Sequence, residues 1–431
     1  MRRKRMYACC LVASLVTVAL AGCGADDGQA ADAQANVTVQ GTEGDTTNGT
    51  KTDQGDVHLR VWAGEEDKDL IATIADNFVK EHASEANITI EWEPMIEGEC
   101  RSNLLGDVLN APDVYTTTDG DIRTIVAGGA ASEVRNPDEI RENNLESAVE
   151  ALTINDKIYG YPITADNGYF LYYNKAYFTE DDIQDLDTIL DIAAKNGKLF
   201  EMDWSSGWYL YSFFGETGLG VGLNDDGVTN FCDWNNAKRE IKGTDVAEAL
   251  LKIAANPGFK SSGDWITGIQ SGDVIACVSG VWDESAIKAA WGDNYGAAKL
   301  PTYTVAGRKV QMACYFGYKM IGVNPYSEHV EWAHKFADYI ASQDNQELRF
   351  AMRGQGPSNI KAAESPEIQD AKAIQAVLAQ SEYSELQRLG SNFWAASTTL
   401  GNTLAAGNPD HVDLQELLDT AVEGITSSTV Q

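Results

Sequence analysis

The sequence predicts an α/β protein built from two lobes, and three observations lead to this expectation. Strand-like alternation and helix-like periodicity follow one another repeatedly from Val57 onward. The body of the chain, about 57–431, is too long for one ordinary hydrophobic core. Its acids are dispersed among apolar residues, and the hydrophobic share of 43% is typical of a globular fold.

The first part of the body alternates between strands and helices. Residues 57–62 (VHLRVW) alternate as in a strand, residues 70–83 carry apolar side chains at helical spacing, and residues 87–94 (NITIEWEP) return to alternation. This order favours an α/β lobe with a largely parallel sheet. Residues 152–173 then predict short extended segments separated by turns.

The second part contains more helix. Residues 181–197 predict an amphipathic helix that stops at Gly197, and residues 244–258 predict another. A short strand is expected at 274–280 and a β-rich region at 297–323. Further helices, beginning at residues 330–342, complete the chain.

The N-terminus carries an export signal. Four basic residues (RRKR) precede an apolar run that is too short to argue for a permanent membrane span. The run ends in Leu20-Ala21-Gly22-Cys23, which resembles the lipobox of bacterial lipoproteins. The resemblance implies cleavage of residues 1–22 and attachment of diacylglycerol to the thiol of Cys23. The alternative is a plain secretory signal with an incidental cysteine.

Residues 23–56 are expected to form the lipidated cysteine and a flexible tether. No aromatic residue occurs between Tyr7 and Trp62, and small and polar residues dominate. Such a segment cannot bury enough apolar surface to offset its ordering entropy, so we expect it to be disordered.

Charge and cysteine content exclude several classes of partner and site. There are 65 acidic and 32 basic residues, for a formal net charge of −33, which argues against binding to nucleic acid or to a bare anionic membrane. Cys100, Cys232, Cys277 and Cys314 remain beyond the signal and Cys23, and none has zinc-like spacing. They could form disulfides or remain as buried thiols. We expect no metal and no cofactor.

Catalysis finds little support in the sequence. The chain has five histidines, and two of them, His329 and His334, are five residues apart and would face different sides of a helix. No GxSxG, HExxH or Walker-type motif occurs. A glycosidase needs two suitably spaced carboxylates, and with 65 acids no pair stands out. We therefore expect a protein that is not an enzyme.

Aromatic residues indicate a sugar site. Trp208, Trp282 and Trp394 lie beside or within three residues of Gly, Ser or Asp, at the ends of expected segments. A tryptophan offers a rigid apolar face, and a pyranose ring offers a patch of C–H groups surrounded by hydroxyls. Phe213 and Phe214, in the same aromatic cluster as Trp208, are expected in the core.

Several stretches carry a family resemblance. They are APDVY with Asp119 behind it, KIYGYPITADNGYFLYYNK, SGVWDES, YGAAKLPTY, RGQGPSN and NFWAAS. From about Val57 to the C-terminus the chain resembles the extracellular solute-binding lipoproteins of carbohydrate ABC importers, the family that includes maltose/maltodextrin-binding proteins. The resemblance implies a two-lobe α/β, periplasmic-binding-protein-like fold with hinge strands and a ligand cleft between the lobes. Residues 57–165 and 317–365 would form lobe I, and residues 166–316 and 366–431 would form lobe II.

The resemblance also implies site residues by position. Asp166 would point into the cleft and accept hydrogen bonds from sugar hydroxyls, while Tyr172 and Tyr173 would pack in the core of lobe II. The expected stacking residues are Trp208, Trp282 and Trp394. The expected polar contacts from lobe I are Glu66, Asp67, Glu99 and Asp119.

Two positions depart from the family pattern. The best-known maltose binders carry an arginine four residues after the tryptophan that matches Trp394, where this chain has Thr398, and a tryptophan near the position of Thr117. An identical ligand pose is therefore not implied.

The function expected from these features is that of a monomeric, lipid-anchored receptor on the extracellular face of the membrane. It would capture maltose or maltodextrin by cleft closure and deliver the sugar to the permease subunits of an ABC importer. The alternatives are a receptor for another oligosaccharide, such as a galactoside or a xylan fragment, a surface glycan-binding protein, or a glycoside hydrolase.

Overall fold

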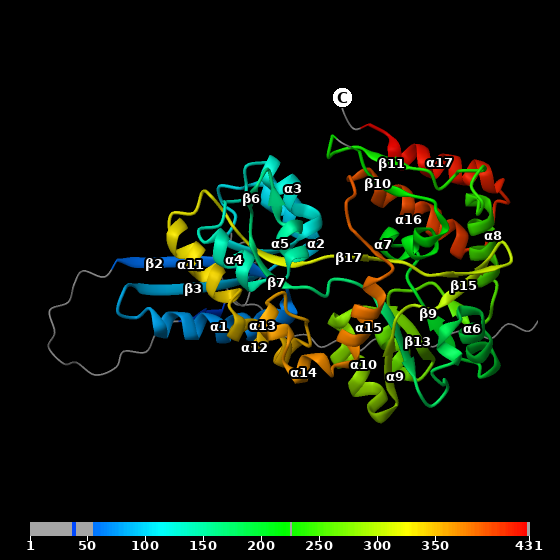
Figure 1. Cartoon of the computed structure of the whole chain (residues 1–431), viewed down its shortest axis with the longest axis horizontal. Helices are drawn as coiled ribbons and strands as arrows, with labels where there is room; N and C mark the ends of the chain where they lie inside the picture. Colours follow the sequence, from blue (N-terminus) through cyan, green and yellow to red (C-terminus); the bar gives the residue numbers. More distant parts are fainter. Residues whose placement is uncertain (1–36, 40–54, 225, 429–431) are drawn as a thin grey trace, which may run out of the picture. The chain divides into compact units, whose positions relative to one another are not determined.

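The computed structural model describes residues 37–39, 55–224 and 226–428 (Figure 1). The predicted signal peptide and the lipidation site at Cys23 lie outside the described residues. Within the expected tether, β1 (Val37–Val39) pairs antiparallel with β3 (Asn87–Pro94). The expectation of disorder is wrong for these three residues, because a short β-branched run has strand propensity and the edge of β3 offers it backbone partners.

The first sheet has the strand order β1-β3-β2-β4-β18-β7. Its remaining strands are β2 (Asp56–Ala63), β4 (Val114–Thr118), β18 (Lys319–Val323) and β7 (Tyr161–Thr164). Strands β3 and β4 run parallel to β2, whereas β18 is antiparallel to both β4 and β7. Segments that are far apart in the sequence therefore share one sheet, and in Figure 1 the yellow helix α11 (Val330–Ile340) packs beside the blue strand β2.

The second sheet has the strand order β12-β9-β13-β8-β14. The strands are β12 (Phe259–Lys260), β9 (Leu199–Glu201), β13 (Val274–Ser279), β8 (Phe170–Asn174) and β14 (Tyr295–Ala298). Strand β9 is parallel to β12 and β13, while β8 is antiparallel to β13 and β14. Both sheets are thus mixed. The prediction of a largely parallel sheet is wrong wherever the chain crosses between the sheets, since each crossing brings in strands of the opposite direction.

Four small two-stranded sheets complete the β-structure of the described residues. They are β5 (Thr153–Ile154) with β6 (Lys157–Ile158), β10 (Val221–Leu223) with β11 (Asn230–Cys232), β15 (Thr302–Val305) with β16 (Arg308–Gln311), and β17 (Cys314–Phe316) with β19 (Ser384–Leu386).

The helices form where the apolar periodicity predicts them. The expected helices at 70–83, 181–197, 244–258 and 330–342 correspond to α1, α6, α8 and α11, and α6 is followed by Gly197 with a left-handed φ of 61°. The other helices are α2 (Glu97–Gly106), α3 (Asp119–Ala127), α4 (Pro137–Asn143), α5 (Glu146–Ala151), α7 (Gly207–Leu210), α9 (Trp265–Ser271), α10 (Glu284–Trp291), α12 (Gln343–Arg353), α13 (Ile360–Ala363), α14 (Pro366–Gln369), α15 (Lys372–Ser381), α16 (Asn392–Ala405) and α17 (Leu414–Thr426). The bounds of the four expected helices are α1 (Lys68–Glu81), α6 (Leu186–Lys195), α8 (Gly243–Ala254) and α11 (Val330–Ile340).

Each large sheet has its own hydrophobic core. One core gathers β2, β3, α1 and α11, and the other gathers β8, β13, α6, α8, α16 and α17. Tyr172, Tyr173, Phe213 and Phe214 lie in the second core, as expected from the sequence. The chain leaves the first sheet after β7, enters the second at β8 and returns at β18.

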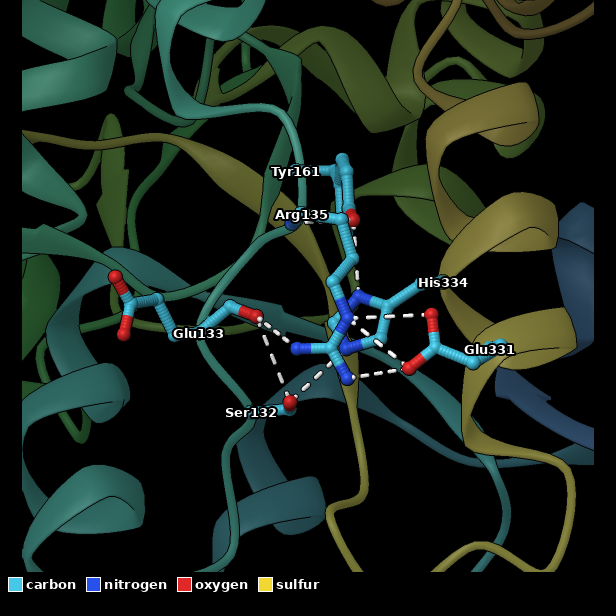
Figure 2. A network of polar contacts seen from close by, with 6 residues as sticks. All are labelled: Ser132, Glu133, Arg135, Tyr161, Glu331 and His334. Carbon is cyan, nitrogen blue, oxygen red and sulfur yellow. Dashed lines mark hydrogen bonds and ion pairs between the residues drawn. The ribbon is translucent and has the colours of Figure 1, made fainter.

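A buried histidine fixes β7 just before the chain leaves the first sheet (Figure 2). The ring of His334 bonds to the hydroxyl of Tyr161 through Nδ1 (2.9 Å) and to that of Ser132 through Nε2 (2.9 Å). Arg135 lies beside this ring and forms an ion pair with Glu331 at 2.8 Å. Burial and the charge of Arg135 lower the pKa of His334 to about 4, so the imidazole is neutral at physiological pH. A neutral imidazole accepts a hydrogen bond at one ring nitrogen and donates one at the other, which suits its two hydroxyl partners.

The four cysteines that the structure describes are free, and none is exposed. Burial raises the pKa of Cys100, Cys232 and Cys314 to about 12. The choice between disulfides and buried thiols, left open by the sequence, is resolved in favour of thiols, of which Cys100, Cys277 and Cys314 are buried and Cys232 is partly buried. Among the described residues, no helix is long and apolar enough to cross a membrane.

Candidate ligand-binding site

A cavity of about 570 Å³ lies where segments flanking the two large sheets meet. Its lining falls into two chemically different parts. The aromatic wall comprises Trp208, Tyr209, Trp282 and Trp394, and the charged wall comprises Glu66, Glu97, Arg101, Asp121 and Lys319. The remaining lining residues are Gly98, Thr118, Gly120, Asn167, Gln387 and Leu389.

The three tryptophans of the aromatic wall come from three separate segments beside the second sheet. Trp208 lies in the short helix α7, Trp282 in a single 3₁₀ turn (Val281–Asp283) after β13, and Trp394 in the first turn of α16. All three side chains are partly exposed and pack against the second core. Since each ring is held on one side and open on the other, the wall offers fixed apolar faces to a ligand.

Two glycines allow these rings to approach. A Cβ at Gly280 would come within 2.1 Å of the Trp282 ring, and a Cβ at Gly207 within 2.1 Å of Ser397 Oγ on α16. Replacing Gly280 would push the Trp282 ring away, and replacing Gly207 would separate α7 from α16. The SGVW and SSGW stretches therefore place their tryptophans by leaving out a side chain next to them.

The charged wall consists largely of ion pairs. Lys319 Nζ donates to Glu97 Oε1 at 2.8 Å, and Arg101 pairs with Asp121 Oδ1 at 2.5 Å. Burial disfavours both charges of the first pair, but mutual attraction outweighs it, so the pKa of Glu97 lies below and that of Lys319 above its usual value. Burial raises the pKa of Asp121 despite the nearby Arg101 guanidinium. Glu66 is exposed and adds an unburied carboxylate to this wall.

Of the eight predicted ligand contacts, the structure brings four to this cavity: Glu66, Trp208, Trp282 and Trp394. The other four do not line it. Asp67 is 2% exposed, and its two carboxylate oxygens bond to Arg349 (2.6 Å) and Arg353 (2.9 Å). Its carboxylate is therefore already paired inside the protein, and Arg349 holds the pKa of Asp67 below its usual value against the opposing effect of burial.

Asp119 and Asp166 are each 1% exposed. Asp119 Oδ1 accepts from the backbone N–H of Tyr318 at 2.8 Å, and Asp166 Oδ2 accepts from that of Gly356. Burial raises the pKa of both carboxyl groups to about 6. These acids support the segments on which they lie, and their neighbours Gly120 and Asn167 reach the cavity instead.

Glu99 is exposed and lies outside the cavity. It is two residues from Glu97 on α2, and residues two apart on a helix point in different directions. Glu97 of the same helix lines the cavity instead.

Sequence reasoning missed Glu97, Arg101, Asp121 and Lys319. Loop lengths in this region differ from those of the family, so positions cannot be matched reliably. With 65 acidic residues in the chain, composition alone does not distinguish a carboxylate that lines the cavity from the others. One signal was available: in a chain of low basic content, Lys319 interrupts an otherwise apolar strand, YKMIGV. A charged residue at such a position needs a partner or a function.

The two departures from the family pattern also have a place in the structure. Thr398 Oγ1 donates to the carbonyl of Ser205 at 2.7 Å and so joins α16 to the segment before α7. Thr117 is fully buried in β4 and does not line the cavity, whereas its neighbour Thr118 does. The charges of this cavity therefore come from other positions.

The arrangement is suited to binding. Flat rings on one side and ion pairs on the other match a ligand with an apolar face and a hydroxylated rim. Within the described ranges, no group of three or more His, Cys, Asp or Glu side chains could hold a metal ion.

Comparison with known proteins identifies the family. Residues 73–376 match the family model described as bacterial extracellular solute-binding protein, which is more than half of the chain. The chain belongs to this family.

Two relatives of this solute-binding protein illustrate the match. A maltooligosaccharide ABC transporter solute-binding lipoprotein of Streptococcus pneumoniae is 25% identical over 350 residues, covering 75% of this chain and 77% of the relative. Maltodextrin-binding protein MdxE of Bacillus subtilis is 25% identical over 337 residues, covering 75% and 78%.

Solved structures show the same fold. The ligand-free maltodextrin-binding protein MalE1 from L. casei superposes with a TM-score of 0.74 at 22% identity, covering 86% of this chain and 99% of that structure. A structure with acarbose gives a TM-score of 0.78 at 25% identity, covering 86% and 98%. The solute-binding protein described here therefore has the two-lobe α/β fold expected from its sequence.

Proposed function

We propose that this protein is the receptor of an ABC importer and that it captures malto-oligosaccharides in the cavity between the aromatic and charged walls. The observation that carries the proposal is the convergence of Trp208, Trp282 and Trp394 on one cavity opposite a wall of charged hydrogen-bonding groups. Two relatives support this choice of sugar, since one is named as a maltooligosaccharide transporter lipoprotein and the other as a maltodextrin-binding protein. No bond is made or broken in this function.

The proposal includes the topology of capture. Residues 57–165 and 317–365 act as one lobe, residues 166–316 and 366–431 act as the other, and the ligand favours the closed arrangement by contacting both. The direct ligand contacts proposed from the predicted set are Glu66, Trp208, Trp282 and Trp394. The lipid on Cys23 holds the receptor at the outer face of the membrane, where it meets the permease subunits.

The experiment is a titration of residues 56–431 against glucose, maltose, maltotriose, maltohexaose, raffinose and xylotriose. Calorimetry or intrinsic tryptophan fluorescence reports binding. We expect micromolar affinity for the malto-series, about −8 kcal/mol, and no response to the other sugars. A response confined to raffinose or xylotriose would keep the receptor and overturn the sugar. Silence toward every sugar would overturn the proposal.

A second measurement separates the receptor from an enzyme. After incubation with maltohexaose for a day, chromatography should return maltohexaose alone. Shorter products, absent from a sample of heat-denatured protein, would show a glycoside hydrolase instead.

A further inference from the structure

Lys319 is a buried lysine at the surface of a binding cavity. It lies in β18, only 7% of it is exposed, and it lines the cavity together with Glu97. Burying an ammonium group is costly unless the group is paired and hydrogen-bonded. The buried charge of Lys319 is therefore expected to have a specific partner or role.

The acids around Lys319 have different partners. Asp67 is bonded to two arginines, and Asp166 accepts from the amide of Gly356. Among the residues that the structure describes, Glu97 is the carboxylate hydrogen-bonded to Lys319, with Nζ and Oε1 2.8 Å apart. An ammonium has three donors and this bond uses one, so two N–H groups remain. The carboxylate keeps its second oxygen, Oε2.

The pair therefore presents a charged donor and a charged acceptor side by side, one hydrogen-bond length apart. Two adjacent hydroxyls on a pyranose ring have a matching arrangement, since one oxygen can accept from the ammonium while the other hydroxyl donates to the carboxylate. Hydrogen bonds to charged groups are the strong ones. The aromatic wall lines the same cavity and offers flat rings to the apolar face of such a sugar.

We propose that Lys319 and Glu97 together bind a vicinal pair of sugar hydroxyls and so select the orientation of one ring in the cavity. This inference rests on the proposed function, because it assigns a hydroxylated ring to the cavity. Attraction between the partners raises the pKa of Lys319 and lowers that of Glu97, which keeps both in the charged form that this binding needs.

The competing explanation is an ion pair that only joins β18 to α2. Both explanations predict that removing Lys319 lowers stability, because the Glu97 carboxylate loses its partner. Only the binding role predicts that a folded variant loses affinity. Lys260 supplies a matched control, since its Nζ lies 2.8 Å from Glu201 Oε1 and neither residue lines the cavity.

The test measures the Kd for maltotriose by calorimetry at pH 7.5, with residues 56–431 carrying Lys319→Met, Lys319→Arg, Glu97→Gln or Lys260→Met. Melting temperatures of the free variants report folding. We expect Lys319→Met and Glu97→Gln each to weaken binding about tenfold or more. Lys319→Arg should restore part of the affinity, and Lys260→Met should bind as the natural protein does.

Combining Lys319→Met with Glu97→Gln should cost less than the two single effects together, because both act on one pair of hydroxyls. If Lys319→Met fails to fold, Glu97→Gln decides, since it keeps the size of the side chain. Natural affinity in a folded Glu97→Gln or Lys319→Met variant would overturn the inference and leave the proposed function intact. Failure of the unaltered protein to bind maltotriose, despite a normal melting transition, would overturn both.

Discussion

The two walls of the cavity hold their side chains in place by different interactions. The aromatic wall holds three rings in place by packing, with close approach at Gly280 and Gly207. The charged wall holds its side chains by pairing, as in Lys319 with Glu97 and Arg101 with Asp121. Packing fixes a surface that tolerates many ligands with a flat apolar face, whereas paired charges fix directions in space. We therefore expect the aromatic wall to contribute mainly contact area and the charged wall to contribute directed hydrogen bonds that fix the orientation of the ligand.

Removing an aromatic face should have the largest effect. Trp282→Ala or Trp394→Ala is expected to weaken maltotriose binding by about 2–3 kcal/mol, because a stacked indole is a large buried contact at a binding site. Calorimetry with residues 56–431 measures the change. Trp332→Ala is the control, since Trp332 is partly buried against the first core and lies outside the cavity. Unchanged affinity in both site variants would end the assignment of the aromatic wall.

The buried acid Asp166 sharpens the comparison from the polar side. Burial raises the pKa of Asp166 to about 6 in the folded protein. Between about pH 4 and pH 6 the folded protein therefore keeps a proton that the unfolded chain has released, and the free energy of unfolding falls as the pH rises through this range. Asp166→Asn, which keeps an acceptor for the amide of Gly356, should gain about 2 kcal/mol at pH 7.5 and nothing at pH 4.

Denaturant unfolding at both pH values measures this gain, and the Kd for maltotriose is measured alongside it. We expect nearly unchanged affinity, because Asp166 supports the site from behind. A large loss of binding in a stable Asp166→Asn variant would instead support the direct sugar contact that the sequence suggested.

His334 should respond to pH in the opposite sense. Its pKa of about 4 means that the unfolded chain takes up a proton near pH 6.5 and the folded protein does not. Stability is therefore lost as the pH falls from 6.5 to 4, and His334→Gln should reduce this loss by about 1–2 kcal/mol. Unfolding curves at pH 7.5 and 4.5 provide the measurement, with His329→Gln as the control for losing an imidazole. Equal acid sensitivity in all three proteins would contradict the assignment.

A smaller effect is expected at Arg388, which lies between two residues of the cavity lining. Arg388 donates to the carbonyls of Asp119 (3.0 Å) and Ala151 (3.3 Å), and its neighbours Gln387 and Leu389 line the cavity. Arg388→Met should weaken maltotriose binding by about 1 kcal/mol, because these neighbours lose their anchor. Arg60→Met, which breaks an ion pair with Glu93 outside the cavity, should have no effect on the Kd.

The three tryptophans of the aromatic wall could be predicted from the sequence because tryptophans are few and because the family resemblance singles out their positions. The chain has 10 tryptophans, and matching to the family by position selects Trp208, Trp282 and Trp394. The strands and helices of each lobe could also be predicted, since their apolar periodicity is local. Strand direction could not, because it depends on where the chain crosses between sheets.

The charged wall could not be predicted because the local sequence does not distinguish a carboxylate that is bonded within the protein from one that lines the cavity. The family resemblance predicts ligand contacts at Asp67, Asp119 and Asp166, and all three are buried and bonded within the protein. It also predicts Glu99, whereas Glu97 on the same helix lines the cavity. Whether a side chain faces the cavity or the interior depends on one or two residues of loop length. That information exists only in three dimensions.

Because the thiols described above are not exposed, this protein could be converted into an optical sensor by adding one labelled cysteine. None of Cys100, Cys232, Cys277 and Cys314 is exposed, and burial raises the pKa of each, so few thiolates are available to a labelling reagent at neutral pH. A single cysteine introduced at an exposed position beside the cavity would then take up a maleimide dye selectively. Residues 56–431 could report sugar by a change in colour or brightness without any native cysteine being replaced.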